Sequence, residues 1–485
     1  MTEARLRAVL AEPRLARLMA LLNADGQEAR VVGGAARNAL LGLPIEDVDI
    51  ATTARPEVVT ARARAAGFRP APTGFDHGTV TVVIDRKAFE VTTLRHDVET
   101  DGRHARVVFG RDFDADARRR DFTINAFSLS ADGVLHDPLG ARDDLVARRV
   151  RFIGDAGARI AEDYLRILRF FRFHALYGRG PLDAAGLAAA IAGRAGLARV
   201  SGERARTELF KLLAAPDPVP VVTAMTDGGL FLTLLGAVVS PPRLERLLAE
   251  PADVGEMAPR DSATPRSDSA TPHSDSVARR LDGAAGRLDS VARLGALAVR
   301  VVEDVDALRG RLKLSNVETR RLRSAAQFLE TWHGAPCAPH GARLAELALR
   351  HGAATIGEAL RLAALDAPAQ AGYAAARAAL AHYGDLKPPV SGDDFKKRGL
   401  TEGKAIGVAL KTLQAAWIRA DFPRDPAVVA RLIDEAAHAA LAHAAQAQDA
   451  QAQDAHAQDA PSRKGPPHDA LPHGSDAPQP PSPTR

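Results

Sequence analysis

The sequence predicts an α+β protein in which a mixed-sheet head over residues 1–150 precedes an all-helical remainder. Short β-type runs between glycine and other turn signals are concentrated in these first residues. After Arg159 the pattern changes, because alanine, leucine and arginine recur at helical spacing with few β-branched runs. Strands followed by a long run of helices are typical of the α+β class.

Five short segments predict the strands of the head. Each is rich in β-branched or aromatic residues and lies between turn signals. They are Ala29–Val32, Val48–Thr52, Thr79–Ile84, Phe89–Leu94 and Val107–Phe109.

Two low-complexity stretches fall outside the predicted core. Between residues 250 and 276 a degenerate Asp-Ser-Ala-Thr-Pro repeat, beginning at Asp261 and again at Asp268, predicts a flexible insertion. Over residues 444–485 Ala-Gln-Asp repeats run into a segment of Pro, His, Asp and Ser. Because large apolar residues are almost absent there, we expect a disordered tail.

Composition limits the class of protein. The chain has 485 residues, 46% apolar and 26% charged, which predicts a soluble globular protein with a sizeable core. No run of about eighteen apolar residues occurs, so no membrane span is expected, and the charges interleaved through Met1–Leu22 predict a surface helix rather than a secretory signal. The single cysteine, Cys337, excludes an internal disulfide and fits a reducing cytoplasm. A net charge of +4 permits a nucleic-acid partner without requiring one.

A glycine pair ends the first predicted strand. Gly33 and Gly34 stand where a helix opens, so the backbone can approach a ligand closely and the helix N-terminus can attract phosphate. Arg37, one turn later, would add a phosphate contact. For the glycine pair alone, a tight turn beside a solvated arginine is the alternative.

Acidic residues follow on the next strand. Asp47 and Asp49 are predicted to share one face, about 7 Å apart at Cα, while Val48 points into the core. Two carboxylates on one face repel unless a cation lies between them, and oxygen ligands suit Mg²⁺ together with substrate phosphates. Glu90, on a later strand, would complete the set if that strand neighbours the first, and a surface position on an edge strand is the alternative.

Three consecutive arginines, Arg118–Arg120, lie against an apolar segment. Guanidinium groups bind phosphate through paired N–H donors, so these residues favour an anionic ligand. The alternative is a solvated loop in which they pair with Asp112, Asp114 and Asp116.

A predicted helix carries Asp163, Arg166, Arg169 and Arg172 in a row spaced by three residues. An ordinary ion pair is one interpretation of the first two. The other is base reading, since a carboxylate accepts from an amino group and a guanidinium donates to a ring acceptor, as cytosine and adenine require. Uracil and guanine would place a carbonyl against Asp163, and such an unpaired polar group costs about 1–3 kcal/mol.

Taken together, these motifs resemble the class II tRNA nucleotidyltransferase and bacterial poly(A) polymerase family, and most closely its CCA-adding members. One departure is Ala36-Arg37-Asn38, where the family motif usually ends Val-Arg-Asp. No His-Asp phosphohydrolase motif is found in the helical part, so phosphatase activity is not expected. Further segments carry the resemblance: Thr92–Arg95 with Thr100–Ala105, Arg119–Ala126, Asp137-Pro138, Asp144-Leu145, Glu162–Arg169, Ser201–Arg204, Glu208–Leu213 and, more weakly, residues 389–394 and 406–417.

The resemblance implies template-independent addition of C, C and A to tRNA 3′ ends from CTP and ATP, with no protein partner inferred. Mg²⁺ ions would be held by Asp47 and Asp49, with Glu90 as a third catalytic carboxylate. Residues 97–105 match a flexible loop that the family uses in the switch from C to A. The implied nucleotide-binding residues are Gly34 and Arg37 at the helix start, Arg120 on ribose or phosphate, Asp163 and Arg166 on the base, and Arg169 and Arg172 completing the pocket.

The resemblance also implies a division of the chain. It gives a nucleotidyltransferase head of the DNA polymerase β superfamily (1–150), a base-reading helical neck (151–215), a helical body (216–385) and a C-terminal helical module (386–443). Composition, and not the resemblance, adds the flexible insertion at about 250–290 and the disordered tail (444–485).

Three other functions were weighed. A poly(A) polymerase shares the head and neck but would use ATP alone and usually carries a basic C-terminal extension. A sugar-nucleotide glycosyltransferase with an Asp-x-Asp motif needs neither the arginine-rich motif nor the acid–arginine helix. A non-catalytic RNA-binding protein would gain nothing from two acids aimed at phosphates.

Overall fold

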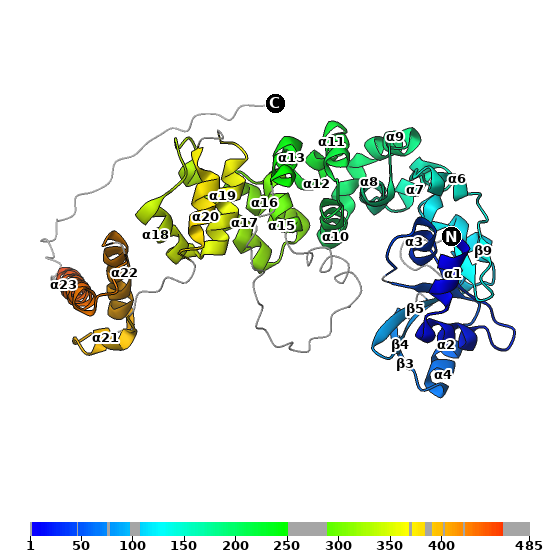
Figure 1. Cartoon of the computed structure of the whole chain (residues 1–485), viewed down its shortest axis with the longest axis horizontal. Helices are drawn as coiled ribbons and strands as arrows, with labels where there is room; N and C mark the ends of the chain where they lie inside the picture. Colours follow the sequence, from blue (N-terminus) through cyan, green and yellow to red (C-terminus); the bar gives the residue numbers. More distant parts are fainter. Residues whose placement is uncertain are drawn as a thin grey trace, which may run out of the picture. The chain divides into compact units, whose positions relative to one another are not determined.

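The computed structural model describes residues 2–45, 47–74, 78–97, 107–250, 289–367, 371–383, 390–400, 403–420 and 422–458 (Figure 1). The chain divides into two compact units, Met1–Pro339 with Arg350–Gly384, and His340–Leu349 with Asp385–Arg485. The expected insertion falls largely on residues 251–288, and most of the expected loop on 98–106; both ranges lie outside the described residues. Within the described part, no helix combines the length and apolarity needed to cross a bilayer.

A mixed sheet forms the head of the first unit, as the sequence predicts (Figure 1). Its strands are β1 (Ala29–Val32), β2 (Asp49–Thr52), β3 (Arg69–Gly74), β4 (Thr79–Ile84), β5 (Lys87–Thr93), β8 (Ser128–Ser130) and β9 (Leu135–His136). They lie in the order β3-β4-β5-β2-β1-β8-β9. β2 runs parallel to β5, and the other neighbouring pairs are antiparallel. A separate two-stranded sheet pairs β6 (Arg95–Asp97) with β7 (Val107–Phe109).

The strand bounds agree with the prediction at β1, β4 and β7 and differ elsewhere. β5 begins two residues earlier than expected, at Lys87. β2 begins at Asp49, so Asp47 precedes the strand instead of lying on it. The alternation of exposure nevertheless begins at Asp47, because Asp47 and Asp49 are exposed and Val48 is buried. The two acids therefore point away from the core, as expected.

The sequence did not predict β3, β8 and β9. β3 carries Pro70 and Pro72, and a proline cannot donate to a sheet ladder. Because β3 lies at one end of the sheet, its outer N–H groups have no strand to bond, so proline is tolerated there. β8 and β9 are three and two residues long, too short for a periodicity signal.

Four helices cover the head: α1 (Thr2–Leu10), α2 (Pro13–Leu22), α3 (Gly34–Leu41) and α4 (Pro56–Ala65). α2 begins with proline in its first turn, and the Glu12 carboxylate caps it by accepting from the Leu15 N–H at 2.8 Å. Its buried residues recur at helical spacing and join the core beneath the sheet.

The head and the following helices share one hydrophobic core. Buried residues of this core come from α6 (Arg142–Val146), α7 (Ala156–Glu162), α8 (Leu165–Tyr177), α9 (Ala184–Ala192) and α10 (Gly202–Leu213). The short helix α5 (Phe113–Arg118) belongs to two smaller clusters instead. Phe122 packs on Phe152 and on Phe173 of α8, with ring centroids 4.8 and 5.2 Å apart. Such aromatic contacts fix α8 against the head.

The rest of the first unit is helical, as predicted. Its described helices are α11 (Val219–Asp227), α12 (Leu230–Leu235), α13 (Pro241–Ala249), α15 (Ser290–Ala298), α16 (Val302–Leu312), α17 (Asn316–Trp332), α19 (Ala353–Ala364) and α20 (Tyr373–Leu380). α15 is buried along its whole length and continues the shared core. The division of this unit into head, neck and body stays a prediction.

The second unit has its own core around Phe395, Leu413, Trp417 and Ile433. Its helices are α21 (Gly392–Lys396), α22 (Gly403–Arg419), α23 (Pro426–Gln458) and most of α18 (Gly341–His351). α23 corrects the expectation of disorder from residue 444, because the helix continues to Gln458. The Ala-Gln repeat lacks apolar residues for a core, yet alanine and glutamine are good helix formers.

Candidate functional site

A cavity of about 770 Å³ lies between the glycine turn of the head and the start of α8. Nine of the ten residues selected from the sequence line it: Gly34, Arg37, Asp47, Asp49, Arg120, Asp163, Arg166, Arg169 and Arg172. Glu90 is not among its lining residues. The structure thus gathers side chains from positions 34 to 172 around one space.

Gly33 and Gly34, which form the glycine turn, line the cavity. β1 ends at Val32, Gly33 follows with a φ of 64° that is unfavourable for other residues, and α3 begins at Gly34. A Cβ at position 33 would lie 2.7 Å from Arg120 Nη1, whereas one at Gly34 would meet its neighbours at ordinary distance. Gly33, which was not assigned a binding role, is therefore the position that requires glycine, because it lets Arg120 approach the turn.

Acidic side chains are brought together at the edge of the cavity. Asp47 and Asp49 line it, and β5 places Glu90 directly beside Asp49 in the parallel register. The strand that carries Glu90 is thus the neighbour that the prediction required. Among the described residues no trio of His, Cys, Asp or Glu side chains is arranged to hold a metal ion by itself. Asp47 and Asp49 fit a divalent ion that takes its remaining oxygens from substrate phosphates and water, and Glu90 as a third ligand stays a prediction.

Arg37 is a buried part of the cavity wall, with 5% of its surface exposed. Its guanidinium donates to Asn125, to Asn38 Oδ1 at 3.0 Å and to the Tyr177 hydroxyl at 2.7 Å, and it stacks over the Tyr177 ring. Burial lowers the pKa of Arg37. At Asn38 the sequence departs from the family motif. Its side-chain oxygen accepts from the guanidinium of the preceding Arg37 and helps to fix its orientation. Tyr177 and Asn125 were not predicted, because both bonds span more than 80 residues of sequence.

Two of the three consecutive arginines pair with the same buried acid. Arg119 and Arg120 both pair with Asp116, the latter at 2.9 Å. Burial would raise the pKa of Asp116, but Arg120 and Arg119 outweigh it and lower that pKa. The alternative that the arginines pair with nearby acids is therefore confirmed for Asp116. Asp112 instead caps the N-terminus of α5. Arg120 still lines the cavity.

Asp163 and Arg166 line the cavity but are not paired with each other as a simple ion pair would require. Asp163 lies between α7 and α8 in extended backbone, and its carboxylate accepts from the Leu165 N–H at 3.0 Å. This local bond interrupts the expected single helix. Arg204 of α10 donates to Asp163 at 2.6 Å, while Arg166 pairs with Glu162. The expectation of one continuous row from Asp163 to Arg172 is thus wrong at its first residue.

The last two arginines of α8 are fixed by buried acids. Arg169 pairs with Asp121 at 2.6 Å, and Arg172 with Glu208 of α10 at 2.6 Å. Burial would raise the pKa of Asp121, but Arg169 and the hydrogen bond from Asn125 outweigh it and lower that pKa. Sequence analysis did not single out Asp121 or Glu208 as site residues, although both lie within motif segments. Their partners are 48 residues away in the first case and 36 in the second.

The fold and this site define a nucleotidyltransferase head joined to a helical part, for which the name neck is kept below. Residues 29–151 match the family model described as the poly A polymerase head domain, and residues 187–240 match the probable RNA and SrmB-binding site of polymerase A. In these segments the chain is similar to the class II CCA tRNA nucleotidyltransferases and bacterial poly(A) polymerases.

Individual relatives point in the same direction. The chain is 50% identical over 192 residues to the mitochondrial CCA tRNA nucleotidyltransferase 1 of Danio rerio, covering 38% of this chain and 44% of the relative. It is 40% identical over 230 residues to the CCA-adding enzyme of Geobacillus thermodenitrificans, covering 47% of this chain and 56% of the relative. The matches therefore span about half the length of these curated relatives.

Solved structures extend the likeness to most of the chain. The CCA-adding enzyme of Bacillus stearothermophilus in complex with CTP superposes with a TM-score of 0.62 at 27% identity, covering 86% of this chain and 96% of that one. The Thermotoga maritima CCA-adding enzyme complexed with tRNA superposes with a TM-score of 0.59 at 18% identity, covering 89% of this chain and 97% of that one, and this likeness concerns the fold alone.

Proposed function

We propose that this chain adds CMP, CMP and AMP from CTP and ATP to the 3′ end of tRNA. The observation that carries the proposal is one cavity that presents Asp47 and Asp49 on the head side and Asp163 and Arg166 on the neck side. Phosphate and base of one nucleotide can thus be bound from opposite sides of the same space. The names of the matched relatives support the same reaction.

Asp47 and Asp49 would hold Mg²⁺ ions. Bound there, Mg²⁺ would lower the pKa of the tRNA 3′-hydroxyl and neutralise the departing pyrophosphate. Exposed carboxylates next to a glycine turn suit this role, because the N-terminus of α3 offers free N–H groups to the phosphates. Glu90 beside Asp49 would orient the set from β5.

The neck residues would bind and select the base. Asp163 accepts from the amino group of cytosine or adenine, and Arg166 donates to the adjacent ring nitrogen. The guanidinium of Arg204 donates to the Asp163 carboxylate. A base that binds Asp163 must therefore compete with Arg204 for this carboxylate. Arg37 and Arg120 would contact phosphate or ribose, while Arg169 and Arg172 complete the wall with orientations set by Asp121 and Glu208.

RNA would be the macromolecular partner of the protein. The cytoplasm would be its location. The match over residues 187–240 to a probable RNA-binding segment supports the first. The second rests on cysteine use, because the one cysteine in the sequence, Cys337, is exposed as a free thiol, which suits a reducing compartment.

An incorporation assay tests the proposal. The full-length protein is incubated with Mg²⁺ and a tRNA transcript ending at the discriminator base, with each labelled nucleotide alone and with all together. We expect C, C and A to be added and extension then to stop, and a transcript that already ends in CCA to gain nothing. Long A tracts would instead establish a poly(A) polymerase, and UTP incorporation equal to that of CTP would refute base reading by Asp163 and Arg166.

A further inference from the structure

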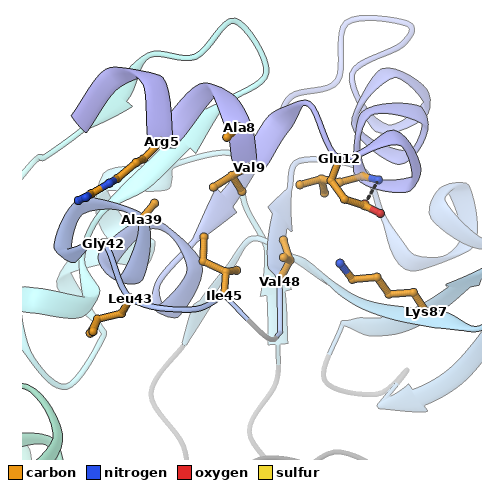
Figure 2. Close-up of a pocket in the computed structure, with 11 residues that line it drawn as sticks. Arg5, Ala8, Val9, Glu12, Ala39, Gly42, Leu43, Ile45, Val48 and Lys87 are labelled. Carbon is orange, nitrogen blue, oxygen red and sulfur yellow. Dashed lines mark hydrogen bonds between the residues drawn. The ribbon is translucent and has the colours of Figure 1, made fainter. Parts of the chain in front are cut away.

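A second cavity lies in the head, between α1, α3, the segment that precedes β2 and the start of β5 (Figure 2). We propose that it binds a small amphipathic carboxylate, with an apolar chain of medium length and one anionic head. Its volume is about 380 Å³, within the range of about 300–1,000 Å³ found for ligand pockets. It shares Leu43 with the nucleotide cavity, but its other lining residues differ.

The middle of this cavity is apolar. Val9 of α1, Ala39 of α3 and Val48 form its walls, with Ile45 between the last two along the chain (Figure 2). Val9, Ala39 and Val48 are each at most 9% exposed, so they belong to the head core and are held in place by it. An alkyl chain in this space would remove the remaining apolar surface from water.

Charged side chains stand at the two ends. Arg5 and Lys87 lie on opposite sides of the apolar middle (Figure 2), and neither forms an ion pair with a described residue. Glu12, the acid in the lining, is bound by Arg14 Nε at 2.7 Å and by the Leu15 N–H at 2.8 Å. Its charge is thus engaged within α2, and the cavity offers more positive than negative charge to a ligand.

The anionic head is assigned to the Arg5 end. Glu12 lies near Lys87 and offsets part of its charge, whereas no acid among the described residues lines the cavity beside Arg5. The guanidinium lies against Gly42, where the missing side chain leaves room for it at this end of the cavity. A guanidinium offers two parallel N–H donors, which match the two oxygens of a carboxylate.

Occupation of this cavity would also reach the proposed catalytic acids. Val48 stands between Asp47 and Asp49 in the chain and faces the other way, so a ligand against Val48 would restrict the motion of the backbone that carries both acids. This consequence rests on the proposed function. We expect a bound carboxylate to change kcat of nucleotide incorporation by a few-fold and to leave the KM for CTP within about twofold.

Calorimetric titration of the full-length protein with decanoate, below its micelle concentration, tests the site. We expect one saturable site per chain, and at least tenfold weaker binding of decyltrimethylammonium, which has the same chain and the opposite charge. Arg5→Ala should weaken decanoate binding at least tenfold, and Val9→Trp, which fills the cavity, should abolish it. Arg7→Ala is the matched control, because Arg7 is on the same helix but pairs with Glu3 at 2.8 Å, and it should bind as wild type does.

Equal affinity for the two chains of opposite charge, or unchanged decanoate binding in Arg5→Ala, would overturn the proposal. A thermal unfolding curve shows whether Val9→Trp folds, and if it does not, Arg5→Glu takes its place with the same expected loss. Binding is measured without turnover. A failed incorporation assay with intact, charge-selective decanoate binding would therefore count against the nucleotidyltransferase function and not against this site.

Discussion

On the head side of the nucleotide cavity, Asp47 and Asp49 are exposed at the start of β2, whereas on the neck side every arginine of α8 is paired with an acid. Arg166 pairs with Glu162, Arg169 with Asp121 and Arg172 with Glu208. The head thus presents negative charge that is open to solvent, and the neck presents positive charge whose orientation is fixed.

The two sides of the cavity therefore differ in what nucleotide binding requires of them. Carboxylates side by side repel each other, so the head side depends on a cation that is brought with the nucleotide. The arginines are already ordered, so a nucleotide that binds them loses little side-chain entropy. Substitutions on the head side should therefore change chemistry and leave stability intact, whereas substitutions among the acids behind the neck should change stability.

The largest effect is expected for Asp49→Ala. Loss of the acid that would hold Mg²⁺ should lower kcat of nucleotide incorporation by about 10³-fold or more, while tRNA affinity stays within a few-fold. The unfolding free energy should stay within about 0.5 kcal/mol of the wild-type value, since Asp49 is an exposed residue. Quenched-flow incorporation and urea unfolding measure the two quantities.

Asp143→Ala is the control for this variant, because Asp143 is an exposed acid in the first turn of α6 and does not line the cavity. Turnover of Asp49→Ala at the rate of this control would reject the assignment of Asp49 to the metal.

Asp121→Asn should show the reverse behaviour. Arg169 would keep only its longer contact with Glu208, at 3.7 Å, so the unfolding free energy at pH 7 should fall by about 2 kcal/mol. The pKa of Asp121 is lowered in the folded protein, so its stabilisation is complete above the unfolded value of about 3.9 and is lost as the pH falls through the folded pKa. The difference from wild type should therefore shrink below about pH 4, as urea unfolding at pH 7 and pH 3 would show. A difference that stays constant with pH would contradict the ionised pair.

Asp163→Ala should act on selectivity. Without the carboxylate, the penalty for a carbonyl at the base edge disappears, so the preference for CTP over UTP should fall about 10- to 100-fold in kcat/KM. Glu162→Ala is a useful comparison, because it frees Arg166 and leaves Asp163 in place. An unchanged CTP-to-UTP ratio in Asp163→Ala would place base selection elsewhere.

The smallest effect is expected for Tyr177→Phe. The ring that stacks on Arg37 is kept and one hydrogen bond at 2.7 Å is lost, which should lower the unfolding free energy by about 1 kcal/mol. Thermal or urea unfolding measures it. A loss above about 3 kcal/mol would mean that the hydroxyl, and not the stacked ring, anchors Arg37.

The sequence was sufficient for the fold class and for the nine of the ten selected residues that line the cavity, because these lie in short local motifs. Alternating burial placed Asp47 and Asp49 on one face, and the glycine pair marked the start of α3. Partners of the charged groups were not accessible in the same way. Asp163 meets Arg204 across 41 residues, and Asp121 meets Arg169 across 48, so no local spacing reports either contact.

Local chemistry also misled in two places. The row from Asp163 to Arg172 has helical spacing, yet the Asp163 carboxylate bonds the Leu165 N–H and ends that regularity. At the other end of the chain, the polar composition of residues 444–458 indicated disorder, whereas α23 runs through them. In both cases a backbone hydrogen-bonding preference prevailed over the pattern of apolar residues.

The outer strands of the head sheet have a consequence for self-association. β3 carries Pro70 and Pro72 at one border, and β9 closes the other border with two residues. A foreign strand needs a continuous ladder of donors to add to a sheet, and neither border supplies one. The prolines that conceal β3 from sequence reading therefore also protect a concentrated solution of the protein from edge-to-edge aggregation.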